Sequence, residues 1–135
     1  MSHFTKIKVE IRDEGCLLKA LEDLGYEYRK DADIRGFGGQ RMRVDIALPM
    51  EGGYDIGFRR KGDGFEMVAD LWGLKVDKDE FLKQVQQRYA YHTVLEQAKT
   101  QGFTVVEEQE LEDGSIRLVC EREEEVAAPE HVVEA

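Results

Sequence analysis

The sequence from residue 41 to residue 71 reads RMRVDIALPMEGGYDIGFRRKGDGFEMVADL, and this stretch decides the fold. It holds three short runs, residues 41–48, 54–58 and 65–71, in which apolar side chains alternate with polar ones as in half-buried strands. A proline followed by a Gly-Gly pair separates the first two runs, and a Gly-Asp-Gly turn separates the last two. The stretch therefore predicts three successive antiparallel β-strands.

A strand and a short helix are predicted ahead of this stretch. Residues 5–11 alternate between apolar and charged side chains, and Asp13 then stands where the N-cap of an amphipathic helix is expected. Gly25 marks the end of that helix, because glycine accepts the left-handed conformation found there. We expect a short strand at residues 26–29 and, over residues 31–40, a glycine-rich loop without regular structure.

A long helix and a final pair of strands are predicted after it. Asp77, with a glutamate three residues later, resembles a capping box that opens a helix running to about residue 100. Residues 103–105 and 116–120 alternate like strands, with an Asp-Gly turn between them. This order predicts an α+β fold, a single two-layer sandwich of a mainly antiparallel sheet with both helices on one face. Each helix ends in glycine, an aromatic residue and an alternating strand, which indicates either an internal pseudo-repeat or the general preference for glycine at helix ends.

Length and charge limit the number of domains and the kinds of partner that the chain can have. The 135 residues are the size of one domain, which we place at residues 1–122. The formal net charge is −10, and from residue 107 onward 11 acids meet only 2 bases, so residues 123–135 are expected to form an acidic, disordered tail. The remaining bases are interleaved with acids, which predicts no nucleic-acid partner. No apolar leader or run of about 20 apolar residues is found, so we expect a cytoplasmic protein without a membrane partner.

Catalytic, metal and cofactor motifs are not recognised in the sequence. Cys16 and Cys120 lack the spacing of a metal site or a disulfide framework, and we expect both to be reduced and buried. His3 and His131 stand near opposite ends of the chain, which argues against a three-histidine zinc site. We therefore predict no metal, no cofactor and no catalytic residue, which favours a protein without enzymatic activity.

The long helix carries the first group of candidate binding residues. Its apolar stripe changes side partway, because Tyr89 and His92 fall with the first stripe whereas Tyr91 and Val94 fall on the opposite side. Either the helix bends around the core, or its second half faces a loop of the chain, a second subunit or another protein. Arg88, Tyr89 and His92 bring a cation, a phenol and an imidazole together, a set suited either to binding an anion or to structural contacts.

The second group of candidate binding residues lies in predicted loops. Arg35 precedes the glycine-rich stretch Gly36-Phe37-Gly38-Gly39, and Phe37 lies within it. The stretch lacks the spacing of a phosphate-binding loop and is not followed by a predicted helix. We interpret both as mobile loop residues that are able to close over a surface. Trp72 follows the last of the three central strands and is a candidate for an exposed aromatic anchor.

Five motifs resemble one known family: MSHFTKI at 1–7, ALEDLGY at 20–26, GYDIGF at 53–58, QRYAYH at 87–92 and DGSIRL at 113–118. The family is the conserved hypothetical open reading frame of cyanobacteria and algal plastid genomes, also called domain of unknown function 1257. The resemblance covers nearly all of residues 1–120 and implies a cytosolic or stromal protein without a known catalytic set. By association of neighbouring genes it also implies an AAA-type ATPase or a ferredoxin as partner. The glutamate-rich end departs from the family pattern.

Two hypotheses for function remain open at this point. The first is a non-enzymatic protein-binding or adaptor subunit of a larger soluble assembly, motivated by the divided stripe of the long helix. The second is a protein or small enzyme that binds a small anion through Arg88, Tyr89 and His92, with Arg35 and Phe37 closing above them. An exposed surface at Tyr91 and Val94 favours the first hypothesis, and a closed pocket lined by the three polar residues favours the second.

Overall fold

The computed structural model describes residues 3–122 and 131–134. The chain divides into two compact units, Met1–Gln86 and Gln87–Ala135, and the division falls inside helix α2 (Lys78–Thr100). The α+β class is confirmed, while the single domain over residues 1–122 stays a prediction.

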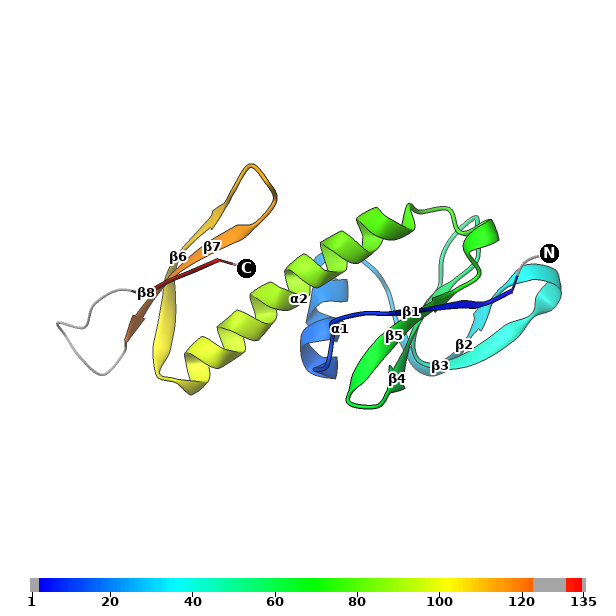
Figure 1. Ribbon diagram of the computed structural model, residues 1–135, viewed down its shortest axis with the longest axis horizontal. Helices are drawn as coiled ribbons and strands as arrows, with labels where there is room; N and C mark the ends of the chain where they lie inside the picture. Colours follow the sequence, from blue (N-terminus) through cyan, green and yellow to red (C-terminus); the bar gives the residue numbers. More distant parts are fainter. Residues whose placement is uncertain (1–2, 123–130, 135) are drawn as a thin grey trace. The chain divides into compact units, whose positions relative to one another are not determined.

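Five antiparallel strands form the sheet of the first unit, in the order β1-β5-β4-β3-β2 (Figure 1). Their bounds are β1 (Thr5–Lys8), β2 (Arg29–Arg35), β3 (Arg41–Leu48), β4 (Ile56–Lys61) and β5 (Gly64–Ala69). The three strands predicted between residues 41 and 71 are confirmed as β3, β4 and β5, each paired with the next along the chain. A hairpin arrangement of this kind follows from the two turns that the sequence carries.

Helix α1 (Glu14–Asp23) forms as its end signals predict. The carboxylate of Asp13 accepts a hydrogen bond from the backbone N–H of Cys16 at 3.0 Å, and Gly25, just after the helix, has a φ of 83°. Leu17 and Leu21 on its inner face are fully buried. On the same side of the core, the ring of Phe81 from the start of α2 stacks with Phe58 of β4 at 6.3 Å between centroids.

The outer half of the β2–β3 hairpin curls over the other face of the sheet. Ile34 and Val44 belong to one apolar cluster with Ala47 and Val68. Since Val68 lies on β5 and β4 separates that strand from β3, residues of β2 reach it only by folding across the sheet face. Gly57 of β4 permits this approach, because a Cβ there would lie 2.8 Å from a methyl carbon of Val44.

The bend in β2 begins at an unusual backbone position. Asp31 has a φ of 51°, and no other non-glycine residue among residues 3–122 and 131–134 has a positive φ. Beyond this point β2 continues to Arg35, through residues for which the sequence predicted a loop, and only residues 36–40 connect it to β3. The prediction failed because the exposed side of this strand is charged and only Ile34 is fully buried, so the expected alternation is weak.

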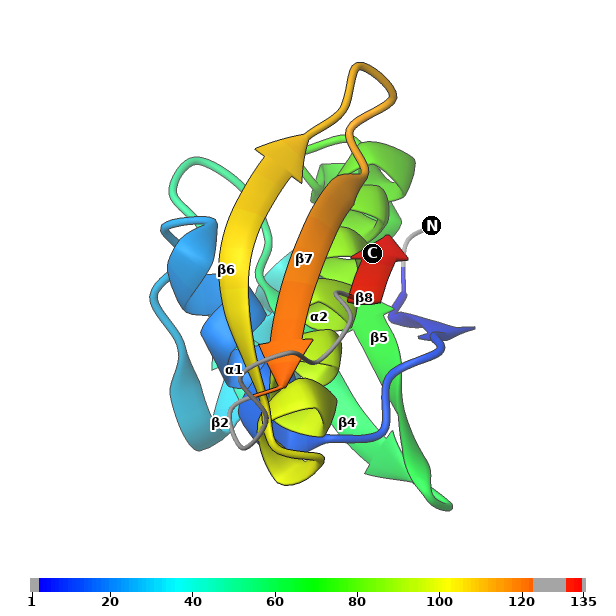
Figure 2. The same ribbon diagram turned by 90° about the vertical axis from the view of Figure 1, so that its left-hand side faces the viewer.

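The second unit holds a separate sheet in the order β6-β7-β8, with strands β6 (Phe103–Glu110), β7 (Ile116–Arg122) and β8 (His131–Glu134) (Figure 2). Tyr91 and Ala98 from the second part of α2 pack against the inward side chains of β7, which are Ile116, Leu118 and Cys120. Val94 is partly buried against the same cluster. This explains the two apolar stripes of α2. Side chains of the first stripe pack in the core of the first unit, and side chains of the second stripe pack in the core of the second unit.

Two expectations are corrected by this arrangement. The chain builds two sheets instead of the single sheet that was predicted, because the strands after α2 pair with each other and bury the second stripe of the helix. Residues 131–134, which were predicted to belong to a disordered tail, pair with β7 as strand β8, while residues 123–130 and 135 lie outside the described part of the chain. The antiparallel ladder with β7 supplies hydrogen-bond partners that sequence composition alone does not reveal.

Candidate binding site

Three segments of the first unit meet around Arg35, Phe37 and Trp72. They are the tip of the β2–β3 hairpin (residues 36–40), the connection between β3 and β4 (residues 49–55) and the segment after β5 (residues 70–74). Their backbones are joined directly, because the N–H of Asp55 donates to the carbonyl of Arg35 and the N–H of Tyr54 donates to the carbonyl of Gly73. The curl of the hairpin is what brings the first segment to the other two.

Asp55 fastens Arg35 to the connection between β3 and β4. Both oxygens of this buried carboxylate are used: Oδ2 accepts from the Nε of Arg35 at 2.9 Å, and Oδ1 accepts from its Nη2 at 2.8 Å. The backbone N–H groups of Arg35 and Met50 also donate to it. Arg35 was expected to be a mobile loop residue, and that expectation is wrong, since its guanidinium is fixed by a bidentate ion pair and by carbonyls of the same connection.

The environment of Asp55 changes the pKa of both partners. Burial raises the pKa of Asp55, but the hydrogen bonds from the Arg35 side chain and from the two backbone N–H groups outweigh burial and hold the pKa below its usual value. The hydrogen bond to Asp55 and its negative charge raise the pKa of Arg35. The pair is therefore ionised, and its role is to hold the loops in place.

Asp70 holds the two aromatic residues of the site. Its side chain is buried, and its Oδ2 accepts from the backbone N–H of Phe37 at 3.1 Å while its Oδ1 accepts from the backbone N–H of Trp72 at 3.2 Å. One carboxylate thus bridges the hairpin tip and the short 3₁₀ helix after β5. Because the two N–H groups are bound to the same buried group, the rings of Phe37 and Trp72 are positioned relative to each other.

The rings of Phe37 and Trp72 contact each other on the exposed surface of the first unit. Their centroids lie 5.8 Å apart in an edge-to-face arrangement, yet 42% of Phe37 and 74% of Trp72 are exposed. Gly73 allows the backbone of this segment to lie against the ring of Tyr54, where any Cβ would overlap the ring. The sequence-predicted residues Arg35, Phe37 and Trp72 are therefore brought together, with Arg35 as a support and the two aromatic side chains on the surface.

Two hollows are lined by the β2–β3 hairpin and the β3–β4 connection. The larger, of about 450 Å³, is lined by the hairpin tip, by Arg41 and by the glycines of the β3–β4 connection. The other, of about 320 Å³, is lined by Arg29, Arg35, Arg41 and Asp55 together with residues of β2 and β3. Arg35 and Arg41 are directly opposite each other in the β2–β3 ladder and contribute to both hollows.

The helix residues predicted as a site lie in the second unit and have structural contacts there. The guanidinium of Arg88 lies over the ring of Tyr91 at 4.3 Å from its centroid, and the ring of His92 meets the edge of the same tyrosine at 5.0 Å. The hydroxyl of Tyr91 donates to Glu108 of β6, and its ring is largely buried. Of the alternatives left open for the second half of α2, packing against its own unit is the one found, since Tyr91 is buried and Val94 is partly buried there. The roles of Arg88, Tyr89, Tyr91, His92 and Val94 in binding stay predictions.

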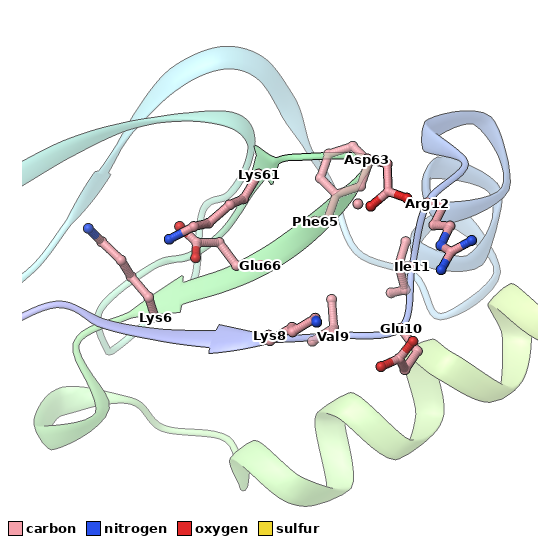
Figure 3. Close-up of a pocket in the computed structure, with 11 residues that line it drawn as sticks. Lys6, Lys8, Val9, Glu10, Ile11, Arg12, Lys61, Asp63, Phe65 and Glu66 are labelled. Atoms are coloured by element: carbon pink, nitrogen blue, oxygen red, sulfur yellow. The ribbon is translucent and has the colours of Figure 1, made fainter.

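A third hollow of the first unit, with a charged lining, was not predicted. It has a volume of about 460 Å³ and runs along β1 and the β4–β5 turn, with Phe65 and Ile11 at its base (Figure 3). Lys6 and Lys8 line it together with Asp63 and Glu66, and Glu66 is already held by Arg59 at 2.7 Å. Charges of both signs alternate around it, so its lining does not favour an anionic or a cationic ligand.

Residues 3–122 and 131–134 show neither a metal-binding cluster nor a membrane-spanning helix. This part of the chain holds no group of three or more histidine, cysteine, aspartate or glutamate side chains that are placed to hold a metal ion. Cys16 and Cys120 are buried free thiols, as predicted, and burial raises the pKa of Cys120. No helix in the described residues is both long enough and apolar enough to cross a bilayer.

Sequence analysis missed the two carboxylates that organise the site. Asp70 directly follows the fully buried end of β5, and Asp55 precedes the buried start of β4. A carboxylate next to an apolar strand is a signal that was available, because such a group is normally hydrogen-bonded when buried. The partners that join separate segments were not predictable, since Arg35 lies 20 positions from Asp55 and Phe37 lies 33 positions from Asp70.

Sequence similarity to known proteins extends over most of the chain. A sequence model of the family described as "Protein of unknown function (DUF1257)" matches residues 20–119. "Uncharacterized protein ycf35" of Guillardia theta is 38% identical over 125 residues, which cover 90% of this chain and 98% of the relative. The proteins of the same description from Cyanophora paradoxa and Pyropia yezoensis are each 36% identical, with the same coverage of 90% and 98%. No solved structure matches the chain.

Proposed function

The chain belongs to the DUF1257 family of proteins of unknown function, and we propose that it is a protein-binding module that docks through Phe37 and Trp72. The observation that carries the proposal is the exposure of two touching aromatic rings on a fixed support. Large aromatic side chains dominate the binding energy of protein interfaces, and exposed ones on a monomer often mark such interfaces. The proposal keeps the adaptor role and moves its surface from α2 to the hairpin tip.

The fixed support makes these residues suitable anchors. Association costs free energy when loops and side chains must be ordered at the interface. Here the carboxylate of Asp70 already orders both aromatic segments, and the Arg35–Asp55 pair orders the connection beside them. A partner that covers the two rings therefore gains apolar burial, worth about 25 cal/mol per Å² of surface removed from water, with little further ordering of this chain.

The partner class follows only from the family resemblance. An AAA-type ATPase or a ferredoxin is therefore proposed as the first candidate, in the cytosol or the stroma. The anion-binding alternative at Arg88, Tyr89 and His92 has weaker support, because Arg88 and His92 already contact the ring of Tyr91.

The test is a native affinity purification with a Phe37→Ala, Trp72→Ala double variant. We expect the wild type to capture a stoichiometric partner that the variant loses, because truncation removes both anchors. Exposed side chains contribute little to folding, so the unfolding free energy of the variant should stay within about 1 kcal/mol of wild type. Urea unfolding followed by circular dichroism checks this second expectation.

Val106→Ser is the matched control. Val106 is also an exposed apolar residue, at 52%, but it lies on β6 in the other unit. The Val106→Ser variant should therefore capture the partner as the wild type does. Equal capture by wild type and by the Phe37→Ala, Trp72→Ala variant would contradict the proposed docking surface.

A further inference from the structure

Two arginines of the β2–β3 hairpin lack acidic partners. Arg29 and Arg41 both line the hollow of about 320 Å³, and both are exposed. Across the described residues 3–122 and 131–134, neither side chain makes an ion pair, a hydrogen bond or a ring contact. The neighbouring arginines differ, since Arg35 is bound to Asp55.

The acids in the same hollow are already engaged. Asp33 forms an ion pair with Arg43, with 3.1 Å between its Oδ1 and the arginine Nε, and Asp55 is bound by Arg35. The hollow therefore carries the charges of Arg29 and Arg41 in excess, although the chain as a whole has a formal net charge of −10. A concentration of uncompensated positive charge on an acidic protein attracts anionic groups.

The chemistry of these residues favours a carboxylate. A guanidinium presents several N–H donors in one plane, which match the two oxygens of a carboxylate or the oxygens of a phosphate. Arg41 follows directly after the hairpin tip that carries Phe37, so a chain segment lying across Phe37 and Trp72 is able to place an acidic side chain in the hollow. Arg41 also lines the larger hollow together with Gly36, Gly39 and Gln40 of that tip, so its charge lies next to the segment that presents Phe37. A polar rim next to an apolar contact is typical of protein interfaces.

We infer that Arg29 and Arg41 bind carboxylates of an acidic segment in the protein partner. This inference rests on the proposed docking through Phe37 and Trp72, and it adds the chemistry of the partner. The aromatic pair supplies the apolar contact, and the two arginines select glutamate or aspartate beside it. Charge pairs of this kind mainly provide specificity and faster association.

The test uses short fluorescein-labelled peptides without tryptophan or tyrosine. One carries glutamates around a single phenylalanine, and its control carries glutamines in their place. Fluorescence anisotropy should show binding of the glutamate peptide to the full chain, weaker binding as NaCl rises from about 0.05 to about 0.3 M, and little binding of the glutamine peptide. An Arg29→Gln, Arg41→Gln variant should bind the glutamate peptide about tenfold more weakly or worse.

A Lys61→Gln, Lys83→Gln variant is the matched control. It removes the same number of positive charges from exposed positions of the first unit and should bind like wild type. Equal binding of the two peptides, no binding of either, or unchanged binding by the arginine variant would overturn the inference. Displacement of the glutamate peptide by inorganic phosphate at equal concentration would also overturn the assignment to an acidic segment. None of these results affects the partner capture that tests Phe37 and Trp72, so the two proposals fail separately.

Discussion

At the scale of single residues, the site depends on two buried carboxylates that receive hydrogen bonds from distant segments. Asp55 and Asp70 are at most 4% exposed, and together they fix three connections of the first unit. A buried charge is tolerated only when its hydrogen-bonding capacity is satisfied. Both residues are therefore structural, and the side chains that they position are the ones proposed to contact a partner.

The depressed pKa of Asp55 predicts an acid sensitivity of the fold. An aspartate in an unfolded chain has a pKa of about 3.9, and the folded value lies lower, so the stabilisation by Asp55 is fully present above that value. It is lost as the pH falls through the folded pKa, because protonation breaks the pair with Arg35. Asp55→Asn should lower the unfolding free energy at pH 7 by about 1–3 kcal/mol and should flatten the loss of stability as the pH falls below about 4.

Urea unfolding at a series of pH values measures this effect. Asp63→Asn, at an exposed turn position, is the control and should follow the wild-type curve. A variant Asp55→Asn with the same acid dependence as wild type would show that the Arg35–Asp55 pair does not contribute to stability.

The local signals in the sequence predicted most of the individual elements. Asp13 and Asp77 cap their helices as expected, with hydrogen bonds to Cys16 and Glu80 at 3.0 Å. The glycines after both helices have positive φ angles of 83° and 81°. These features depend on a few neighbouring residues, so a sequence pattern is sufficient to reveal them.

The pseudo-repeat stays a prediction, supported by the hairpins β2–β3 and β6–β7 that follow the two helices.

At the scale of elements, the curl of the β2–β3 hairpin was beyond sequence analysis. It depends on a contact between Val44 and Gly57 that register alone does not indicate, since Gly57 pairs with Ala47 in the ladder. The positive φ of Asp31 and the contact with Val68 are consequences of tertiary packing. The aromatic pair exists only because this curl brings Phe37 to Asp70.

The contact between Val44 and Gly57 predicts a coupled pair of substitutions. Gly57→Ala should lower the unfolding free energy by about 1–3 kcal/mol, because its Cβ would lie 2.8 Å from a methyl carbon of Val44. Val44→Ala alone should also destabilise the fold, since it leaves a cavity. In the double variant the clash is absent, so the combined loss should be smaller than the sum by about 0.5 kcal/mol or more. Additive losses in a double-mutant cycle measured by urea unfolding would contradict the packing described for the hairpin.

At the scale of the whole molecule, α2 links two units that have separate apolar cores. Phe81 and Val85 are buried in the first unit, and Tyr91 and Ala98 are buried in the second. The change of stripe was visible in the sequence, but its cause was not, because the pairing of β6, β7 and β8 into their own sheet is a non-local event. Composition also suggested disorder for residues 131–134, whereas their stability comes from the ladder with β7.

A continuous helix through both units predicts cooperative unfolding. Leu118→Ala should lower the unfolding free energy by about 2–4 kcal/mol, because Leu118 is fully buried in the second unit. If residues 1–122 form one domain, the fluorescence of Trp72 in the first unit should follow the same shifted transition as the circular dichroism of the whole chain. Trp72 is the single tryptophan of the sequence, so its signal belongs to the first unit alone. A Trp72 transition that remains at the wild-type midpoint would indicate two independently folding domains.

Trp72 also provides the most direct test of the central claim, which is docking through the aromatic pair. Its fluorescence should be readily quenched by iodide in the free protein, since 74% of the residue is exposed. Addition of the captured partner should protect Trp72 from the quencher and change its emission, while the Phe37→Ala variant binds more weakly. Partner binding that leaves the quenching of Trp72 unchanged would contradict the docking surface proposed for this protein.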